Sequence, residues 1–222
     1  MPLATEVGGP RAGRAGSFAG SFSASLRTQT AEQHLAVEAA FALPAQLTDR
    51  ASYAALLGLL QSFYAPLETA LGALTGWDRL TPPIDLAARQ RARLIDDDLR
   101  ALGAAFPAQA SVAGPVPPEL PELPELPELR TLAQGLGCLY VLEGSALGGR
   151  IVARQARAVL GADLPVAFFT SAGREHLGTD WRALQAALDT AAEGSFAQEV
   201  VTAARQTFTA FGHHLDPLGD VR

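Results

Sequence analysis

Apolar residues recur every three or four positions along most of this chain, which is the period of an amphipathic helix. The first such face is formed by Leu26, Thr30, His34, Val37 and Phe41. Ser23 or Ser25 can cap this helix, and we expect it to run to about Leu43, where Pro44 ends it.

The same period predicts further helices over residues 51–71, 84–102, 129–160, 180–192 and 196–214. Candidate N-caps for three of them are Thr48 or Asp49, Thr179 and Ser195. Pro66 should kink the later turns of its helix, and Gly161 is placed to end the longest one. No run alternates with period two over the length of a strand. We therefore predict an all-α fold, a single-domain multi-helical bundle.

The helical domain is expected to span residues 23–216, between a leader (1–22) and a tail (217–222). The leader consists mainly of Gly, Ala, Ser and Pro and lacks the apolar run of a secretory signal, so we expect it to be disordered. Residues 114–129 are rich in proline and repeat PEL four times, which excludes regular helix. A solvated connector is the favoured interpretation, and a segment that docks a partner is the alternative.

Composition narrows the functional classes. The chain has 222 residues, 48% of them apolar, and a formal net charge of −6. No basic stripe is present that could neutralise phosphates, which argues against nucleic-acid binding. The single cysteine, Cys138, forms no internal disulfide and fits a cytoplasmic location. We expect no membrane span, because the most apolar window, Thr131–Gly149, contains Glu143 and several glycines.

Five glycines lie within GLGCLYVLEGSALGG at residues 135–149, inside the longest predicted helix. Each costs about 1 kcal/mol of helix stability relative to alanine. Two explanations are open: a ligand approaches the backbone closely, which we favour, or neighbouring helices pack tightly against it.

His34 lies on the apolar face of the first helix, with Glu38 one turn later. A carboxylate behind a neutral imidazole is typical of histidines that bind metals, because it fixes the tautomer. For this motif taken by itself, a structural His–Glu pair at a helix surface is the favoured explanation. His213 and His214, near the end of the last helix, are expected to interact with the helix dipole.

Three other chemistries find no support in the sequence. A dinuclear carboxylate centre needs Glu-x-x-His on two helices, and the chain has none. Ser145 is not in a GxSxG elbow, and Gly148-Gly149 does not follow a strand.

The segments LRTQTAEQHLAVE (Leu26–Glu38) and LYVLEGSALGGRI (Leu139–Ile151) together resemble the heme oxygenase family. The likeness covers residues 24 to 215 and is greatest to the bacterial, biliverdin-forming branch, which includes enzymes found with bacterial phytochromes. It implies roles for individual residues. His34 would be the axial ligand of heme iron, and Glu38 would support its imidazole. The distal helix would cross the other face of heme at Gly144, Ser145, Gly148 and Gly149.

The resemblance further implies that Arg27 and Tyr140 contact heme propionates, with Arg150 and Arg174 as further candidates. Animal-type members have Asp where this chain has Ser145, as the bacterial branch does. A hydroxyl can hold a distal water but supplies no negative charge.

The implied reaction is the cleavage of heme to biliverdin, CO and ferrous iron by O2 and electrons. Heme is both cofactor and substrate, and a ferredoxin or a reductase would supply the electrons. A biliverdin acceptor such as a bacterial phytochrome is a possible partner. The first alternative is a heme-binding or heme-carrying protein of the same fold without turnover. The second is a helical interaction or small-metabolite protein without heme, similar to thiaminase-like proteins.

Overall fold

The computed structural model describes residues 20–41, 47–103 and 125–215. These residues form eight α-helices and two short 3-10 helices, and no strand, as predicted. The elements are α1 (Phe22–Gln29), α2 (Ala31–Ala40), α3 (Arg50–Ala73), η1 (Trp77–Arg79), η2 (Ala87–Arg89), α4 (Ala92–Ala101), α5 (Leu132–Leu160), α6 (Ala167–Thr170), α7 (Leu177–Ala191) and α8 (Gly194–Leu215). Residues 1–19 of the expected leader, the tail 217–222, Pro44 and residues 114–124 of the connector lie outside the described residues.

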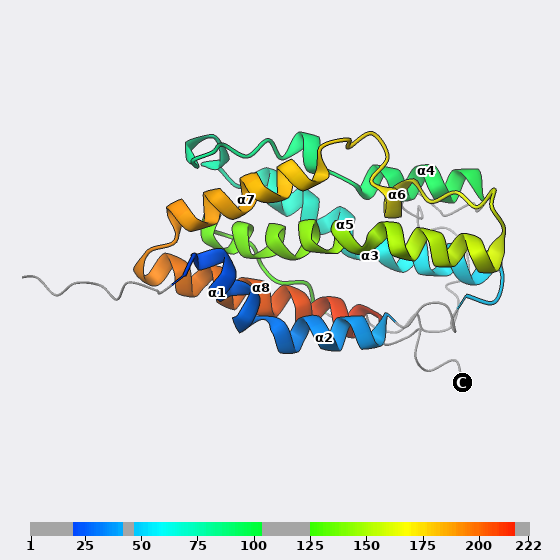
Figure 1. The fold of residues 1–222 in the computed structure, drawn as a ribbon, viewed down its shortest axis with the longest axis horizontal. Coiled ribbons are helices and arrows are strands. Elements are labelled where there is room, and N and C mark those ends of the chain that lie inside the picture. Colours follow the sequence, from blue (N-terminus) through cyan, green and yellow to red (C-terminus); the bar gives the residue numbers. More distant parts are fainter. Residues whose placement is uncertain (1–19, 42–46, 104–124, 216–222) are drawn as a thin grey trace, which may run out of the picture.

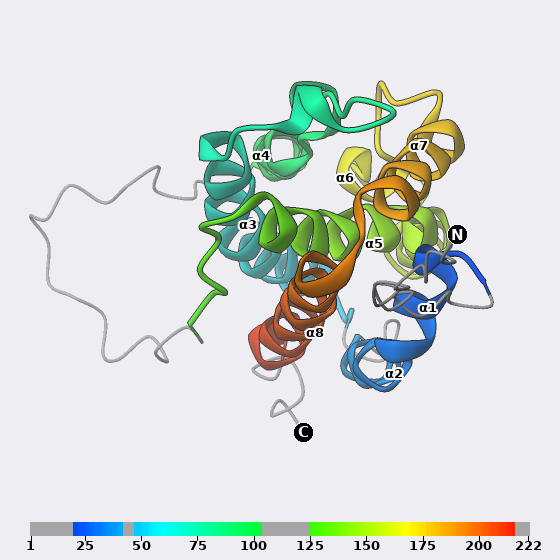
Figure 2. The ribbon, with the colours of Figure 1, turned by 90° about the vertical axis from the view of Figure 1, so that its left-hand side faces the viewer.

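Helix α5 lies at the centre of the bundle (Figures 1 and 2). It packs against α8 along much of its length and also contacts α3, α6 and α7. α2 packs on α8, and α4 packs on α3. By length and composition α5 could cross a membrane, but 61% of its most apolar window is buried inside the fold, as in a core helix.

The core between α3, α5 and α8 is built from the apolar faces that the sequence predicts. Phe63 of α3 stacks on Phe211 of α8 with ring centroids 4.7 Å apart. Asp49 caps α3 in a reciprocal capping box with Ser52, and α3 continues through Pro66. Gly161 ends α5 with φ 109°, which confirms its predicted role.

The prediction of one continuous first helix is wrong, because the structure has two helices there, α1 and α2. At the break, Thr30 has φ −109° and ψ 5°, and its hydroxyl donates to the Leu26 carbonyl at 2.8 Å. Thr30 is buried, so this local hydrogen bond competes with continuation of the helix.

The third predicted helix is also wrong at its start: residues 84–91 contain only η2, and α4 begins at Ala92. The cause is tertiary. Glu68 of α3 accepts hydrogen bonds from the N–H groups of Arg91 (2.7 Å) and Ala92 (3.1 and 3.2 Å), so a side chain from another helix caps α4. Burial raises the pKa of Glu68, and these two N–H donors oppose the shift.

His214 is buried against α3, which contradicts the expectation that it interacts with the helix dipole as a cation; His213 is exposed. The Nε2 of His214 lies 2.8 Å from the Ser62 hydroxyl, which donates to the Leu59 carbonyl. Nε2 therefore carries the proton and donates to Ser62. Burial lowers the pKa of His214, so the fold holds the neutral imidazole.

We expect this burial to make stability depend on pH. Because the folded pKa of His214 is below its unfolded value of about 6.5, only the unfolded chain gains the proton as pH falls below that value. The free energy of unfolding should therefore decrease between about pH 6.5 and the lowered pKa. Urea unfolding at pH 7.5 and pH 5.5 should show a smaller decrease for His214→Gln than for the wild type. His213→Gln is the control, and an equal decrease in all three proteins would contradict the prediction.

Candidate functional site

The five glycines of α5 separate into two groups according to what a Cβ atom would meet. Three lie against neighbouring elements, where a Cβ would collide: Gly135, Gly137 and Gly149. At Gly137 it would overlap the Val200 carbonyl oxygen, and at Gly149 the Phe169 carbonyl oxygen. For these positions tight packing, the less favoured explanation, is correct. Gly149, predicted to lie against a ligand, instead allows α6 to approach α5.

Gly144 and Gly148 face open space. A Cβ on Gly144 would meet only the indole of Trp181, at 3.7 Å, and one on Gly148 would meet nothing within 4 Å. Leu147 and Ile151 on the same part of α5 are 42% and 54% exposed. The structure thus provides a side-chain-poor helical surface flanked by exposed apolar groups, which we call the open face of α5.

The start of α2 lies near α5 at one point. Tyr140, one turn before Gly144, is on the same side of α5, and its hydroxyl contacts the side chain of Thr30, directly before α2. α2 and α5 run in the same direction in Figure 1.

The imidazole of His34 is at a surface, with 53% of its side chain exposed, rather than in the core as its apolar stripe suggests. Its Nδ1 lies 3.6 Å from a Glu38 carboxylate oxygen, as the i, i+4 spacing predicts. Its ring packs edge-on against Phe208 of α8, with centroids 5.6 Å apart. Among the described residues, no hydrogen bond to Nε2 is found.

Arg27 and Tyr140, predicted to act together, line a single cavity of about 220 Å³ between α1, α5 and α7. Trp181 and Gln185 of α7 line its other side. Burial raises the pKa of the Tyr140 phenol, which therefore stays protonated, as a hydrogen-bond donor must. The cavity can accept an anionic group between a guanidinium and a phenol. His34 is not among its lining residues.

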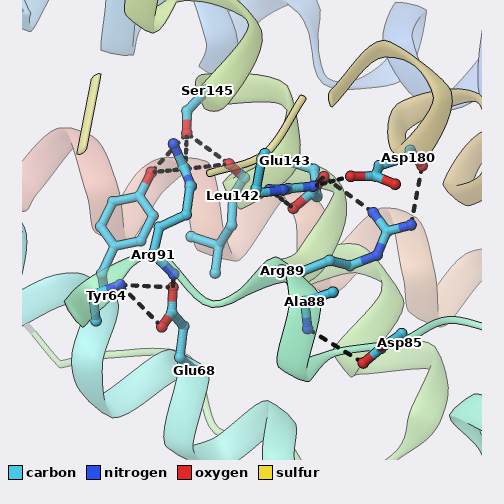
Figure 3. Close-up of polar contacts among 12 residues, drawn as sticks. Tyr64, Glu68, Asp85, Ala88, Arg89, Arg91, Leu142, Glu143, Ser145 and Asp180 are labelled. Carbon is cyan, nitrogen blue, oxygen red and sulfur yellow. Dashed lines mark hydrogen bonds and ion pairs between the residues drawn. The ribbon is translucent and has the colours of Figure 1, made fainter. Parts of the chain in front are cut away.

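The side chain of Ser145 is directed toward Tyr64 and Arg91 (Figure 3). Its hydroxyl donates to the Leu142 carbonyl (2.7 Å) and accepts hydrogen bonds from the Tyr64 hydroxyl (2.6 Å) and the Arg91 guanidinium (3.0 Å). One donor and two acceptor positions are thereby occupied by protein groups. In this arrangement the Ser145 hydroxyl has no free position for a further hydrogen bond, and its role on the distal side stays a prediction.

Arg91 belongs to a buried cluster that sequence reasoning missed. Its guanidinium packs against the rings of both Tyr64 and Phe168, 5.0 and 4.8 Å from their centroids, and donates to the Leu142 carbonyl at 2.7 Å. Arg91 therefore contacts both Tyr64 and Leu142, the two residues that also bind the Ser145 hydroxyl. A single Arg among many in the sequence gave no signal of this role.

Glu143 is the centre of a second buried cluster, also visible in Figure 3. Its two carboxylate oxygens form a bidentate pair with Arg174 (2.8 and 2.9 Å), and one of them also accepts from Arg89 at 3.0 Å. The Arg174 guanidinium also donates a hydrogen bond to the Asp180 carboxylate of α7, at 2.9 Å. Arg174, considered as a propionate contact, is instead buried and paired within the protein. An acidic residue within the most apolar window was the available sequence signal for this cluster.

We expect the two groups of glycines to respond differently to alanine. Gly149→Ala should reduce the free energy of unfolding by about 3 kcal/mol, because the backbone of Phe169 must move. Gly148→Ala should leave it unchanged or raise it by up to about 1 kcal/mol, through helix propensity alone. Denaturant unfolding of the two variants provides a matched comparison. Equal effects would show that the structural distinction is wrong.

Comparison with protein families gives one match: the family described as heme oxygenase matches residues 20–216. A search of curated proteins gives no match.

Proposed function

The chain belongs to the heme oxygenase family, and we therefore propose that it binds heme between α2 and the open face of α5 and cleaves it to biliverdin, CO and ferrous iron. The reaction consumes O2 and electrons from an external donor such as a ferredoxin or a reductase. A cytoplasmic location and transfer of biliverdin to an acceptor such as a bacterial phytochrome belong to the same proposal. The family itself supports the coarser statement that the protein acts on heme or binds it.

The observation that carries the proposal is the position of the exposed apolar side chains. Among the described residues, the large hydrophobic side chains that stay exposed all lie on α2 and α5: Leu35, Leu147, Ile151 and Val159. Exposed apolar surface is costly in water unless a ligand or partner covers it. Gly144 and Gly148 lie on the same helix as three of these residues, and their missing side chains would allow a flat ring to approach the helix backbone. This surface fits a porphyrin.

The donor set also fits. Bound heme would supply an iron centre that reacts with O2 and the macrocycle that is opened. His34 offers the lone pair of Nε2, and neutral imidazole suits iron. A small rotation of the exposed side chains brings Glu38 from 3.6 Å into a hydrogen bond with Nδ1–H, which fixes the tautomer with Nε2 free. Arg27 and the Tyr140 hydroxyl would hold propionate oxygens in their cavity.

On the distal side, the residues of this chain would position the ring and exclude water, and would not themselves react. Gly144 and Gly148 would allow the ring to approach the helix backbone closely. Leu147 and Ile151 exclude bulk water. The Ser145 hydrogen bonds with Tyr64 and Arg91 hold the backbone of this helical turn in place.

One observation favours a second candidate, a heme-binding protein without turnover. The hydroxyl of Ser145 is fully engaged in hydrogen bonds with protein groups. If it stays engaged, it cannot hold a proton-delivering water beside heme. Turnover therefore has to be measured separately from binding.

Titration with hemin tests binding. The wild type should give a saturable Soret band typical of histidine-bound heme. His34→Ala should lose that spectrum and weaken binding at least tenfold, because it removes the iron ligand. His213→Ala, which alters an exposed histidine on α8, should resemble the wild type. Absence of a saturable spectrum in the wild type would refute the proposal.

A time course with a reductant system and O2 tests turnover. The wild-type complex should lose its Soret band and gain biliverdin absorption. If heme remains intact through many equivalents of electrons, the second candidate is correct.

Gly148→Leu tests the location of the ring. Its side chain would extend into the open face, so we expect at least a tenfold loss of hemin affinity while circular dichroism and thermal unfolding stay close to wild type. Unchanged affinity would place the ring elsewhere, and an unfolded variant would mean that Gly148 serves packing.

A further inference from the structure

The indole of Trp181 closes one end of the open face of α5. Its Cη2 and Cζ3 atoms lie 3.7 and 3.9 Å from the position of a Cβ on Gly144. Its ring centroid is 5.2 Å from that of Tyr140, one turn earlier on α5. At Gly148, one turn later, nothing lies within 4 Å of the same position. The face is therefore bounded at its Gly144 end and unbounded at its Gly148 end.

The Glu143 cluster holds the first turn of α7, on which Trp181 lies. The side chain of Asp180 pairs with Arg174 at 2.9 Å, and its backbone carbonyl accepts a hydrogen bond from Arg89 at 3.1 Å. Both arginines also bind Glu143. The residue before Trp181 is thus tied to the residue before Gly144. This fixes the distance between the indole and the glycine.

Trp181 also forms part of the wall of the cavity that contains Arg27 and Tyr140. A carboxylate bound by Arg27 would therefore lie on one side of the indole, and the open face on the other. A rigid aromatic group at this junction restricts how a ligand that uses both regions can turn.

We infer that Trp181 is a specificity-determining residue, a wall that sets the rotational position of the porphyrin in its own plane and thereby which meso edge lies over Gly144 and Gly148. The inference depends on the proposed function. The four edges of the macrocycle are nearly equivalent in shape and differ only in their substituents. An unbounded face would accept several rotational positions, whereas a wall at one end of the face separates them in energy.

The in-plane position can be measured without turnover. In the ferric cyanide complex with hemin, the paramagnetically shifted heme-methyl signals in the proton NMR spectrum report it directly. We expect one dominant set of signals for the wild type. Trp181→Ala should change the ratio of the sets at least twofold, and the ratio of biliverdin isomers should change in parallel.

Two controls separate the wall from a general effect on α7. Trp181→Phe keeps an aromatic wall and should retain the wild-type pattern. Arg182→Ala changes the adjacent, exposed residue and should do the same. Thermal unfolding of all three variants checks that the half-buried position tolerates substitution.

Each outcome supports or overturns the orienting role of Trp181. An unchanged methyl pattern in Trp181→Ala overturns the inference and leaves the proposed function intact. Loss of saturable hemin binding in Trp181→Ala alone also overturns it, since Trp181 would then be a binding residue rather than an orienting one. Failure of the wild type to bind hemin would refute the proposed function itself.

Discussion

The carboxylate of Glu143 and its two arginines are the interaction on which the candidate site depends. All three side chains are at least 90% buried, so each charge has lost most of its hydration and is compensated by the others and, for Arg174, also by Asp180. Removing one partner from such a group costs about 3–5 kcal/mol, because an unpaired charge stays behind. The cluster joins α5, η2, the segment before α7 and α7 itself, which gives the surroundings of Gly144 a single arrangement. Its contribution is therefore more to specificity of structure than to net stability.

Arg91 complements this cluster from the other side of Gly144. Glu143 is bound by Arg89 and Arg174, and Ser145 by Arg91 together with Tyr64. Because both neighbours of Gly144 are held by these contacts, the missing side chain does not make the backbone more flexible at Gly144. The absence of a Cβ at Gly144 therefore provides space for a ligand on the open face, while the backbone there remains well held. A close approach of a flat ring requires both properties.

Helix α5 uses glycine for two physical purposes within fifteen residues. Gly137 and Gly149 let other backbone segments approach the helix, which contributes to the core. Gly148 leaves a surface with no neighbour within 4 Å of a Cβ position, and Gly144 leaves one that only the Trp181 indole borders. The sequence shows that glycines cluster in α5. It does not show which of them lie against a neighbouring carbonyl oxygen and which lie against open space. Only the neighbours of each Cα distinguish the two cases.

The all-α class, the approximate extents of α3, α5 and α8, an N-cap at Thr48 or Asp49 and the end of α5 at Gly161 could all be predicted from the sequence, since periodicity and capping are local properties. The pairing of His34 with Glu38 followed from helical spacing in the same way. Tertiary contacts decided the rest. Glu68 determined where α4 begins, burial made His214 neutral, and Tyr64 with Arg91 engaged the Ser145 hydroxyl. The partners of Glu143 come from segments far apart in the chain, and no local pattern encodes which distant charge will meet it in the fold.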